Sequence, residues 1–217
     1  MYQLYYYPNT ASLAPHFLLY QMGLDYDLLL VDKRAQAHKS EDYLKLNPAG
    51  RIPTLIDDGQ AIFESPAICI HLCEQHPEHA LIPALGTRER PQFFQWLAYL
   101  NNTLQTEILV RYYPQRHTTQ EGAIPSVIEA QNRLIADILD VIDRQLEGHE
   151  YLLGDSLTAC DFFLFMLVGW VPDIQSVDGR YGNLAAHTRR MMQQRAVRAV
   201  FEIEGLDITK FAAWLLK

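Results

Sequence analysis

Residues 47–68 have the sequence NPAGRIPTLIDDGQAIFESPAI, which predicts a β-hairpin followed by a helix. Two short β-type runs, Thr54–Ile56 and Ala61–Phe63, flank Asp57-Asp58-Gly59, and short strands around an Asp-Gly pair are a strong hairpin pattern. Ser65-Pro66 comes directly after the hairpin and is typical of a helix start. Here the serine is expected to be the side-chain cap, with proline at the first helical position, where its missing N–H costs nothing.

The residues before this hairpin alternate between strand and helix patterns. Gln3–Tyr7 is aromatic and strand-like, and Ser12 begins a helical pattern that stops at Gly23. Leu28–Val31 is an apolar run of the buried-strand type, and Ser40–Leu46 is a short helical pattern. The predicted order is therefore βαβαββα, an α/β arrangement of the thioredoxin-like type with a proline just before its third strand.

The cysteines do not fit a redox role. A redox-active protein of this type needs Cys-x-x-Cys at the start of the first helix, whereas this chain has Asn9-Thr10-Ala11-Ser12 there, which excludes disulfide exchange by that route. The three cysteines, Cys69, Cys73 and Cys160, are an odd and small number, which favours a reducing compartment and buried apolar roles. No metal site is predicted.

Helical patterns dominate after residue 80. They cover residues 88–113, 126–146, 158–170 and 181–203, the last with a break near Gln194-Arg195. The sequence therefore predicts a thioredoxin-like domain over 1–79, a linker over 80–87 and an all-α domain over 88–217.

One helix start in the second half is marked by a capping box. Thr158-Ala159-Cys160-Asp161 has the required spacing between a hydroxyl and a carboxylate. We expect loss of the Asp161 carboxylate to lower stability by about 1 kcal/mol.

Composition excludes several classes of function. The chain has 217 residues, 49% of them hydrophobic, and a formal charge of −8 without a dense Lys/Arg cluster, so nucleic acid is not an expected partner. The longest nearly pure apolar run, Phe162–Val171, is far shorter than the roughly 20 residues that span a bilayer. The N-terminus has no pattern of a secretory signal, and we expect a cytoplasmic protein without membrane contacts.

Several short motifs together point to a family. They are Tyr6-Tyr7-Pro8, Ser12-Leu13-Ala14-Pro15-His16, Asn47 to Leu55, Asp57-Asp58-Gly59, Glu64-Ser65-Pro66-Ala67-Ile68, Thr158 to Asp161 and Gln194 to Ala199. Their order and spacing, from Tyr2 to about Leu206, resemble the bacterial cytosolic glutathione transferases, most closely the beta class. The chain departs from that class in two respects: Ala11 aligns with the class's cysteine, and Gln105-Thr106 aligns with its His-Lys pair.

The resemblance implies that glutathione is the co-substrate and suggests which residues bind it. Ser65 at a helix N-terminus is expected to bind the γ-glutamyl carboxylate and Glu64 its ammonium group. A cis peptide between Ile52 and Pro53 is implied, with the Ile52 main chain pairing with the cysteinyl amide like an added strand. Asn9 and Arg51 complete the expected binding residues.

The thiol of glutathione must ionise. A free thiol has a pKa of about 8.5, and a shift of about two units requires roughly 2.7 kcal/mol. A helix N-terminus supplies about 0.3 to 1 kcal/mol and a hydrogen bond to a charged group about 1.5 to 3 kcal/mol. The candidate hydroxyls are, in order, Ser12 as the expected cap of the first helix, Thr10 and Tyr6. His16 is interpreted as a hydrogen-bonded structural histidine.

The expected reaction is conjugation of the thiolate to a small hydrophobic electrophile, by an enzyme that the resemblance implies to be a homodimer. Two alternatives stay open at this point. One is a glutathione-dependent isomerase or reductase that uses the same site, and the other is a non-enzymatic protein of the same fold that binds a protein partner.

Overall fold

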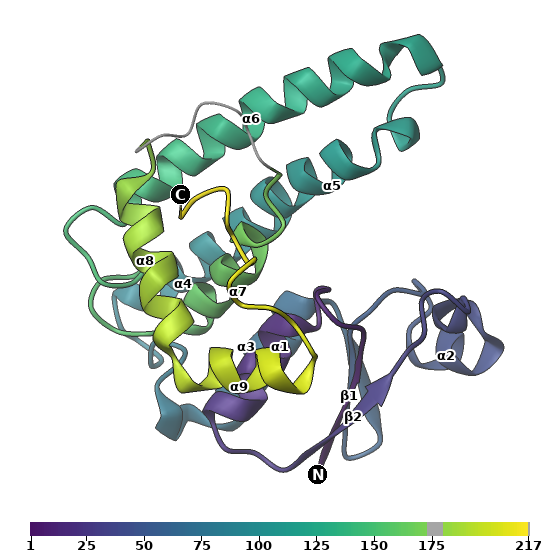
Figure 1. Cartoon of the computed structure of the whole chain (residues 1–217). Coiled ribbons are helices and arrows are strands. Elements are labelled where there is room, and N and C mark those ends of the chain that lie inside the picture. Colours follow the sequence, from purple (N-terminus) through teal and green to yellow (C-terminus); the bar gives the residue numbers. More distant parts are fainter. Residues whose placement is uncertain (173–179, 217) are drawn as a thin grey trace. The chain divides into compact units, whose positions relative to one another are not determined.

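The computed structural model describes residues 1–172 and 180–216, and these form two compact units (Figure 1). The N-terminal unit contains Met1–Gly86 and Met192–Ile208, and the helical unit contains the described parts of Thr87–Met191 and Thr209–Lys217. Residues 192–208 thus group with the N-terminal unit, whereas the sequence analysis expects everything from residue 88 onward to form one helical domain. Each unit is described by itself.

The N-terminal unit is built on a mixed four-stranded sheet with the order β2-β1-β3-β4. Its strands are β1 (Tyr2–Tyr6), β2 (Tyr26–Leu30), β3 (Thr54–Asp57) and β4 (Gln60–Phe63). β1 is parallel to β2 and antiparallel to β3, and β3 is antiparallel to β4. The hairpin prediction is confirmed: Asp57 pairs with Gln60, and the two turn residues, Asp58 and Gly59, both have positive φ, as a two-residue hairpin turn requires.

Four helices accompany this sheet: α1 (Leu13–Gln21), α2 (Glu41–Leu46), α3 (Ser65–Gln75) and α9 (Arg195–Ile203). α1 packs against both α3 and α9, and Figure 1 shows these three on one side of the sheet with α2 on the other. The rings of Phe17 on α1 and Phe201 on α9 are stacked, with centroids 6.2 Å apart. The predicted βαβαββα order and thioredoxin-like fold are confirmed.

The sequence predicts helix caps at Ser12 and Ser65, and neither serine is a cap, whereas Ser40 is one. The Ser40 hydroxyl accepts from the N–H of Tyr43 at 3.3 Å and caps α2. Ser12 precedes α1, but its own backbone is helical, with φ −71° and ψ −17°, and its side chain makes no capping bond. α3 begins at Ser65 itself, which places this residue inside the helix, with Glu64 in the cap position and again no capping bond. The capping predictions for Ser12 and Ser65 are therefore wrong.

The helical unit contains the remaining long helices, close to their predicted positions. They are α4 (Glu89–Tyr99), α5 (Thr106–Tyr112), α6 (Ile124–Gln145), α7 (Ala159–Val168) and α8 (Gly182–Gln193), whose last two residues belong to the N-terminal unit. A π-helical segment, η3 (Leu100–Gln105), joins α4 to α5. Short 3₁₀ turns occur at η1 (Ala37–Lys39), η2 (Pro77–His79), η4 (Pro114–Arg116) and η5 (Glu121–Ala123). None of the helices among the described residues is both long and apolar enough to cross a membrane.

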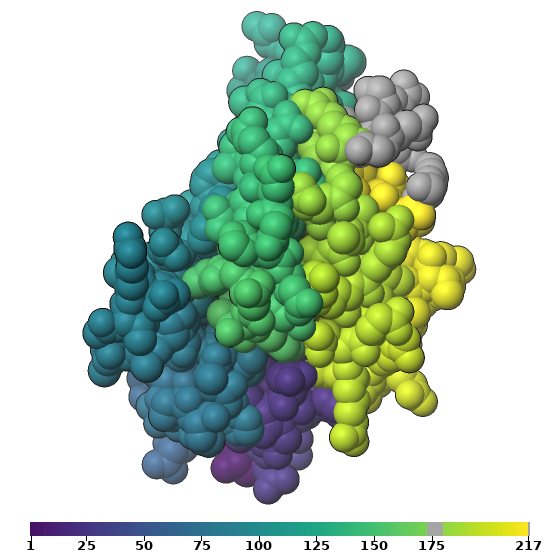
Figure 2. Space-filling view, turned by 90° about the vertical axis from the view of Figure 1, so that its left-hand side faces the viewer, coloured from purple at the N-terminus to yellow at the C-terminus, as the bar shows by residue number. Residues whose placement is uncertain are grey.

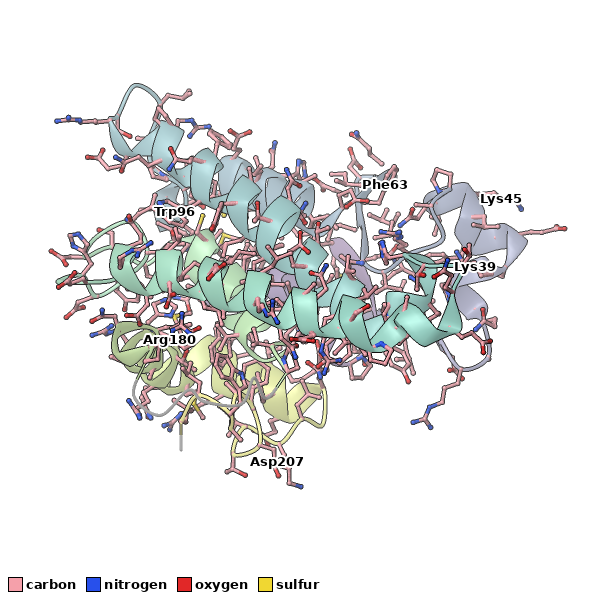
Figure 3. The ribbon with its side chains drawn as sticks, turned by 90° about the horizontal axis from the view of Figure 1, so that it is seen from above. Lys39, Lys45, Phe63, Trp96, Arg180 and Asp207 are labelled. Carbon is pink, nitrogen blue, oxygen red and sulfur yellow. The ribbon has the colours of Figure 1, made fainter. Side chains whose placement is uncertain are left out.

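α7 forms the centre of the helical unit, and all ten of its residues are buried. α6 and α8 lie side by side on the face shown in Figure 2. Arg180, labelled in Figure 3, donates from Nε to Oδ1 of Asp140 at 3.0 Å and joins the start of α8 to α6.

Asp161 connects α7 to two other segments of this unit. The capping box is present, and the carboxylate accepts from the N–H of Thr158 at 2.8 Å. The same carboxylate also accepts from the Thr158 hydroxyl at 2.9 Å and from the N–H of Leu152 at 2.8 Å, and Nε2 of His187 lies 3.0 Å away. The sequence pattern predicts only the contacts between Thr158 and Asp161, because Leu152 and His187 lie outside the capping box.

Replacing Asp161 with alanine is therefore expected to cost more than a single cap. Asp161→Ala leaves several buried donors without an acceptor, so the free energy of unfolding should fall by about 3 kcal/mol or more rather than about 1 kcal/mol. Denaturant unfolding of the variant measures this. Asp155→Ala, at an exposed position shortly before α7, is the matched control and should stay within about 0.5 kcal/mol of the wild type. Equal effects of the two substitutions would contradict the network.

The three cysteines are free and buried, as the sequence analysis expects. Burial raises the pKa of Cys69 well above its usual range, and the adjacent Cys73 adds to this. Burial, with a smaller contribution from Glu74, raises the pKa of Cys73 to about 12. Cys160 is fully buried on α7, and its thiol donates to the carbonyl of Phe93 at 3.4 Å.

These thiols should be unreactive in the folded protein. Because the pKa of Cys69 and Cys73 is raised, almost no thiolate exists at pH 7 to 9, and burial blocks access as well. A disulfide reagent should modify the native protein very slowly across this pH range and should modify all three cysteines after unfolding. Rapid labelling of one thiol in the native state would contradict this expectation.

Candidate functional site

The sheet register brings the candidate residues to one end of the N-terminal unit. Tyr5 in β1 pairs with Thr54 in β3, and Thr54 pairs with Phe63 in β4. The end of β1, the start of β3 and the end of β4 therefore meet at the same edge. The loop 7–12 follows β1, Ile52-Pro53 precedes β3, and Glu64-Ser65 follows β4, so all three candidate segments leave the sheet at this edge.

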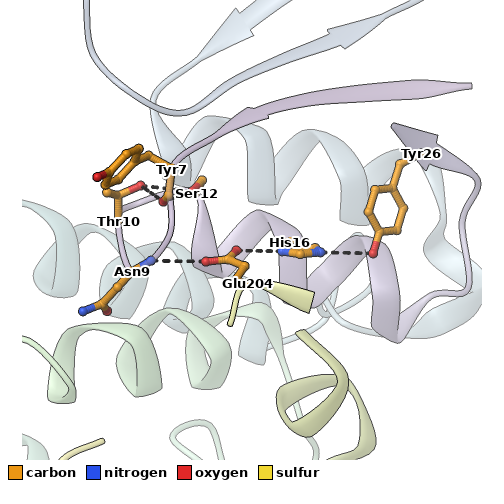
Figure 4. A network of polar contacts seen from close by, with 7 residues as sticks. All are labelled: Tyr7, Asn9, Thr10, Ser12, His16, Tyr26 and Glu204. Atoms are coloured by element: carbon orange, nitrogen blue, oxygen red, sulfur yellow. Dashed lines mark hydrogen bonds and ion pairs between the residues drawn. The ribbon is translucent and has the colours of Figure 1, made fainter. Parts of the chain in front are cut away.

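Two hydroxyl groups cluster in the loop between β1 and α1 (Figure 4). Thr10 donates from Oγ1 to the carbonyl of Tyr7 at 2.7 Å. Oγ of Ser12 lies 3.0 Å from Oγ1 of Thr10 and 3.2 Å from the same carbonyl. Ser12 is completely buried, whereas Thr10 is partly exposed. Of the two hydroxyls, Thr10 is the one that a ligand can reach without a change in the loop.

Tyr6 is the last residue of β1 and directly precedes this loop. Its ring packs edge-on against His16, with centroids 6.3 Å apart. Burial raises the pKa of Tyr6, and the carboxylate of Glu204 raises it further. The phenol therefore keeps its proton at neutral pH, which allows it to donate a hydrogen bond but not to act as a base.

A buried acid that the sequence analysis did not single out contacts the same loop. Oε2 of Glu204 accepts from the N–H of Asn9 at 3.2 Å, and Oε1 lies 2.7 Å from Nδ1 of His16. His16 is fully buried and hydrogen-bonded, which confirms its interpretation as a structural histidine. Glu204 stands next to Gly205 at the end of α9, where an acid is usually solvated, and nothing in the local sequence predicts that it is buried.

The turn between β4 and α3 carries the second candidate group. Ser65 is only 3% exposed, and its Oγ makes no hydrogen bond to any residue that the structure describes. It lowers the pKa of the nearby Cys69 thiol slightly, against the larger effect of burial, but the two groups do not meet hydrogen-bond geometry. A buried hydroxyl without a partner at the N-terminus of an 11-residue helix suits an anion. The first N–H groups of the helix have no acceptor within the helix, and the positive end of the helix dipole lies there, so both favour a negative charge.

Glu64 holds an uncommon backbone conformation immediately before Ser65. Its φ is 70° and its ψ is 113°, a combination that costs a residue with a side chain about 1 to 3 kcal/mol. The Glu64 side chain is exposed, so its carboxylate is available to a cationic group of a ligand. Strain of this kind often occurs at binding sites, where surrounding structure maintains it.

The segment before β3 presents an unpaired main chain. The peptide between Ile52 and Pro53 is cis, as the resemblance implies. The N–H and C=O of Ile52 make no hydrogen bond to the described residues. The adjacent carbonyl of Arg51 is occupied, since it accepts from the hydroxyl of Tyr43 at 2.6 Å and the amide of Asn47 at 2.8 Å. The Arg51 side chain itself is exposed.

Gly50 is required in the turn that leads to this segment. Its φ is +57°, and a Cβ at this position would lie 2.9 Å from the carbonyl oxygen of His38. Only glycine avoids both the backbone strain and the clash.

The chemistry of this edge is that of hydroxyl, main-chain and carboxylate groups. No group of three or more potential metal ligands occurs among residues 1–172 and 180–216. What the edge offers is a hydroxyl pair in the loop 7–12, an unpaired main chain at Ile52, and a buried, unpaired hydroxyl at Ser65 with the exposed acid Glu64 beside it. The main-chain N–H of Asn9, in the loop 7–12, donates to Glu204.

Comparison with known proteins identifies the family. Residues 1–74 match the family "Glutathione S-transferase, N-terminal domain" and residues 105–195 match "Glutathione S-transferase, C-terminal domain". The glutathione S-transferase GST-4.5 of Xanthomonas campestris pv. campestris is 29% identical over 205 residues, which cover 94% of this chain and all of that protein.

Solved structures agree with these matches. BphK, a bacterial glutathione S-transferase solved as a ternary complex, is 33% identical with a TM-score of 0.82 and covers 94% of this chain and all of its own. Two sphingomonad enzymes, one complexed with glutathione and one from Sphingomonas chungbukensis described as beta class, are each 28% identical with a TM-score of 0.81 and the same coverage. This chain therefore belongs to the glutathione S-transferase family.

Proposed function

We propose that the chain binds glutathione along the edge of the sheet described above and conjugates its thiolate to a small hydrophobic electrophile. The observation that carries this proposal is the Ser65 hydroxyl, which is buried at the start of α3 without a partner among the described residues. A buried hydroxyl that is left unpaired is costly, and a carboxylate ligand removes that cost.

Each part of glutathione has a matching group at this edge. The γ-glutamyl carboxylate accepts from the Ser65 hydroxyl and from the first N–H groups of α3, and its ammonium group pairs with the exposed Glu64 carboxylate. The cysteinyl amide pairs with the unoccupied main chain of Ile52, as a peptide does when it adds a strand to a sheet. Arg51, with its exposed side chain, remains the proposed residue for the glycine end.

The thiolate needs a donor, and the loop geometry favours Thr10 over Ser12. The hydroxyls of Thr10 and Ser12 share the carbonyl of Tyr7 as acceptor. When Ser12 donates to that carbonyl, the Thr10 proton is free to turn outward toward a sulfur anion. A hydrogen bond to a charged group supplies about 1.5 to 3 kcal/mol, which covers most of the roughly 2.7 kcal/mol that a two-unit shift requires. Because Ser12 is fully buried, its proposed role is to hydrogen-bond within the loop and leave Thr10 as the donor to the sulfur.

Catalysis then consists of ionisation and positioning. The bound thiol loses its proton to solvent, and the sulfur lone pair attacks the electrophilic carbon. The electron pair of the bond that breaks leaves with the displaced group, such as chloride from a chlorinated aromatic compound. Tyr6 is not the base, because its pKa is raised by burial and by Glu204. The BphK and sphingomonad relatives support this reaction class, one of the latter having been solved with glutathione bound.

We also propose a cytoplasmic homodimer. Three free, buried cysteines suit a reducing compartment, and dimerisation follows from the family resemblance. Analytical ultracentrifugation at micromolar concentration decides the oligomeric state.

Ser65→Ala separates the binding role from a structural role. The substitution removes the donor to the carboxylate, so the affinity for glutathione should fall roughly 10- to 150-fold, the equivalent of about 1.5 to 3 kcal/mol. The free protein should keep its stability or gain about 1 kcal/mol, because an unpaired buried hydroxyl is lost. Calorimetric titration and denaturant unfolding measure the two quantities.

Ser40→Ala is the matched control with the reverse pattern. Ser40 does cap a helix, so its loss should lower stability by about 1 kcal/mol and leave glutathione affinity unchanged. If Ser65→Ala instead lowers stability and leaves the affinity for glutathione unchanged, Ser65 is a structural residue and does not bind the γ-glutamyl carboxylate.

Thr10→Val tests the activation of the thiol. Valine keeps the size of threonine but cannot donate, so the pKa of the bound thiol should rise by about one to two units. Turnover at neutral pH should fall at least about tenfold, and the deficit should disappear above the raised pKa, where the thiol ionises without help. Ultraviolet absorbance of the thiolate against pH gives the pKa directly.

Thr10→Ser is the conservative control and should retain most of the activity. If the pKa of the bound thiol is the same in Thr10→Val as in the wild type but is raised in Ser12→Ala, Ser12 is the donor. An unchanged pKa of the bound thiol in both variants would exclude both hydroxyls as the donor to the sulfur.

A further inference from the structure

A chain of contacts in the N-terminal unit crosses from β2 through α1 and the end of α9 to the loop 7–12 (Figure 4). The Tyr26 hydroxyl lies 3.1 Å from Nε2 of His16, Nδ1 of His16 lies 2.7 Å from Oε1 of Glu204, and Oε2 of Glu204 accepts from the N–H of Asn9 at 3.2 Å. The side chains of both His16 and Glu204 are 0% exposed. None of these groups has a role in the reaction proposed above.

The chemistry of Glu204 fixes the direction of these bonds. An ionised carboxylate only accepts, so Nδ1 of His16 carries a hydrogen and donates, as does the N–H of Asn9. The Tyr26 hydroxyl on the far side can donate to a neutral His16 ring or accept from a protonated one. A carboxylate buried without such partners would cost several kcal/mol, so the acid and its two donors, His16 and the Asn9 N–H, hold one another in place, and Tyr26 holds His16 from its other side.

The Asn9 end of this chain lies directly beside the hydroxyl pair. Asn9 has φ +55°, a left-handed conformation that turns the chain between Pro8 and Thr10. On the helix side, the Thr10 carbonyl accepts from the N–H of Leu13 at 2.9 Å. On the other side, Glu204 holds the N–H of Asn9, in the peptide that joins Pro8 to Asn9. The position of the Thr10 hydroxyl therefore depends on an anchor that lies 195 residues after Asn9 in the chain.

We propose that Glu204 is a positioning residue for the thiol-activating step: it binds the Asn9 N–H while His16, itself held by Tyr26, binds the other carboxylate oxygen, and so it fixes the turn that presents the Thr10 hydroxyl. This inference rests on the proposed function for the role of Thr10. The stacked rings of Phe17 and Phe201 already pack α9 against α1. The inference therefore gives the end of α9 a second role, which is to position the loop 7–12.

Three variants separate positioning from packing. Glu204→Ala removes both acceptors of the carboxylate. Glu204→Gln retains one oxygen for the Asn9 N–H and an amide that can donate to His16, so it is the conservative variant. Glu202→Ala removes an exposed acid from the same helix and is the matched control.

The variants are expected to differ in kcat and in its pH profile, but not in the KM for glutathione. In Glu204→Ala, kcat at neutral pH should fall about tenfold or more, because a small displacement of a positioned group has a large effect. The KM for glutathione should change less than about threefold, because the grip at Ser65 is intact, and the pH profile of kcat should move upward. Glu204→Gln should recover most of kcat, and Glu202→Ala should match the wild type.

A second measurement does not depend on activity. Hydrogen exchange at the Asn9 amide should be slow in the wild type, although Asn9 is exposed, and should accelerate in Glu204→Ala. If Glu204→Ala does not fold, Glu204→Gln provides the comparison. The exchange rate of its Asn9 amide should lie between the rate in the wild type and the rate in the unfolded chain.

The outcomes distinguish this inference from the proposed function. A lowered melting temperature in Glu204→Ala with an unchanged pH profile and unchanged Asn9 exchange would overturn the positioning role. A wild-type protein that neither binds glutathione nor turns over a chlorinated aromatic acceptor would overturn the proposed function instead, and the exchange experiment would still report whether Glu204 anchors the loop.

Discussion

Buried polar atoms need hydrogen-bond partners, and this requirement organises the described structure. Asp161 satisfies it with donors from Leu152, Thr158 and His187, and Glu204 satisfies it with His16 and the N–H of Asn9. Ser65 does not satisfy it, and its hydroxyl remains unpaired at the N-terminus of α3. Gln105, Gln131 and Thr188 in the helical unit also carry unpaired buried oxygens, but Gln131 and Thr188 lie inside helices, and Gln105 lies where η3 continues without a break into α5. Position, rather than the missing bond alone, makes Ser65 the candidate.

The proposed chemistry divides between two helix starts at one edge of the sheet. The start of α3 supplies charge complementarity for the carboxylate, while the loop before α1 supplies a hydroxyl for the sulfur. The thioredoxin-like framework supports both tasks without a redox-active cysteine, because Asn9-Thr10-Ala11-Ser12 occupies the position where Cys-x-x-Cys would stand. The cysteines that the chain does have are buried, with the pKa of Cys69 and Cys73 raised, so they cannot take over that role.

Features set by neighbouring residues could be predicted from the sequence, and features set by distant residues could not. The hairpin at Asp58-Gly59, the order βαβαββα and the break at Gln194 between α8 and α9 all follow from local patterns, and the structure has them. The caps at Ser12 and Ser65 failed because a cap depends on the backbone angles of one residue and on where the helix starts, and these are set by tertiary context. Glu204 could not be found at all, since its partners, His16 and Asn9, lie 188 and 195 residues away in sequence. The grouping of residues 192–208 with the sheet unit escaped prediction for the same reason.

The most direct test of the central claim is a crystal structure of the protein grown with glutathione. We expect the γ-glutamyl carboxylate within hydrogen-bond distance of Oγ of Ser65, the cysteinyl amide paired with the main chain of Ile52, and the sulfur within about 3.5 Å of Oγ1 of Thr10. An empty edge at saturating glutathione, or a tripeptide bound with its carboxylate away from Ser65, would contradict the account.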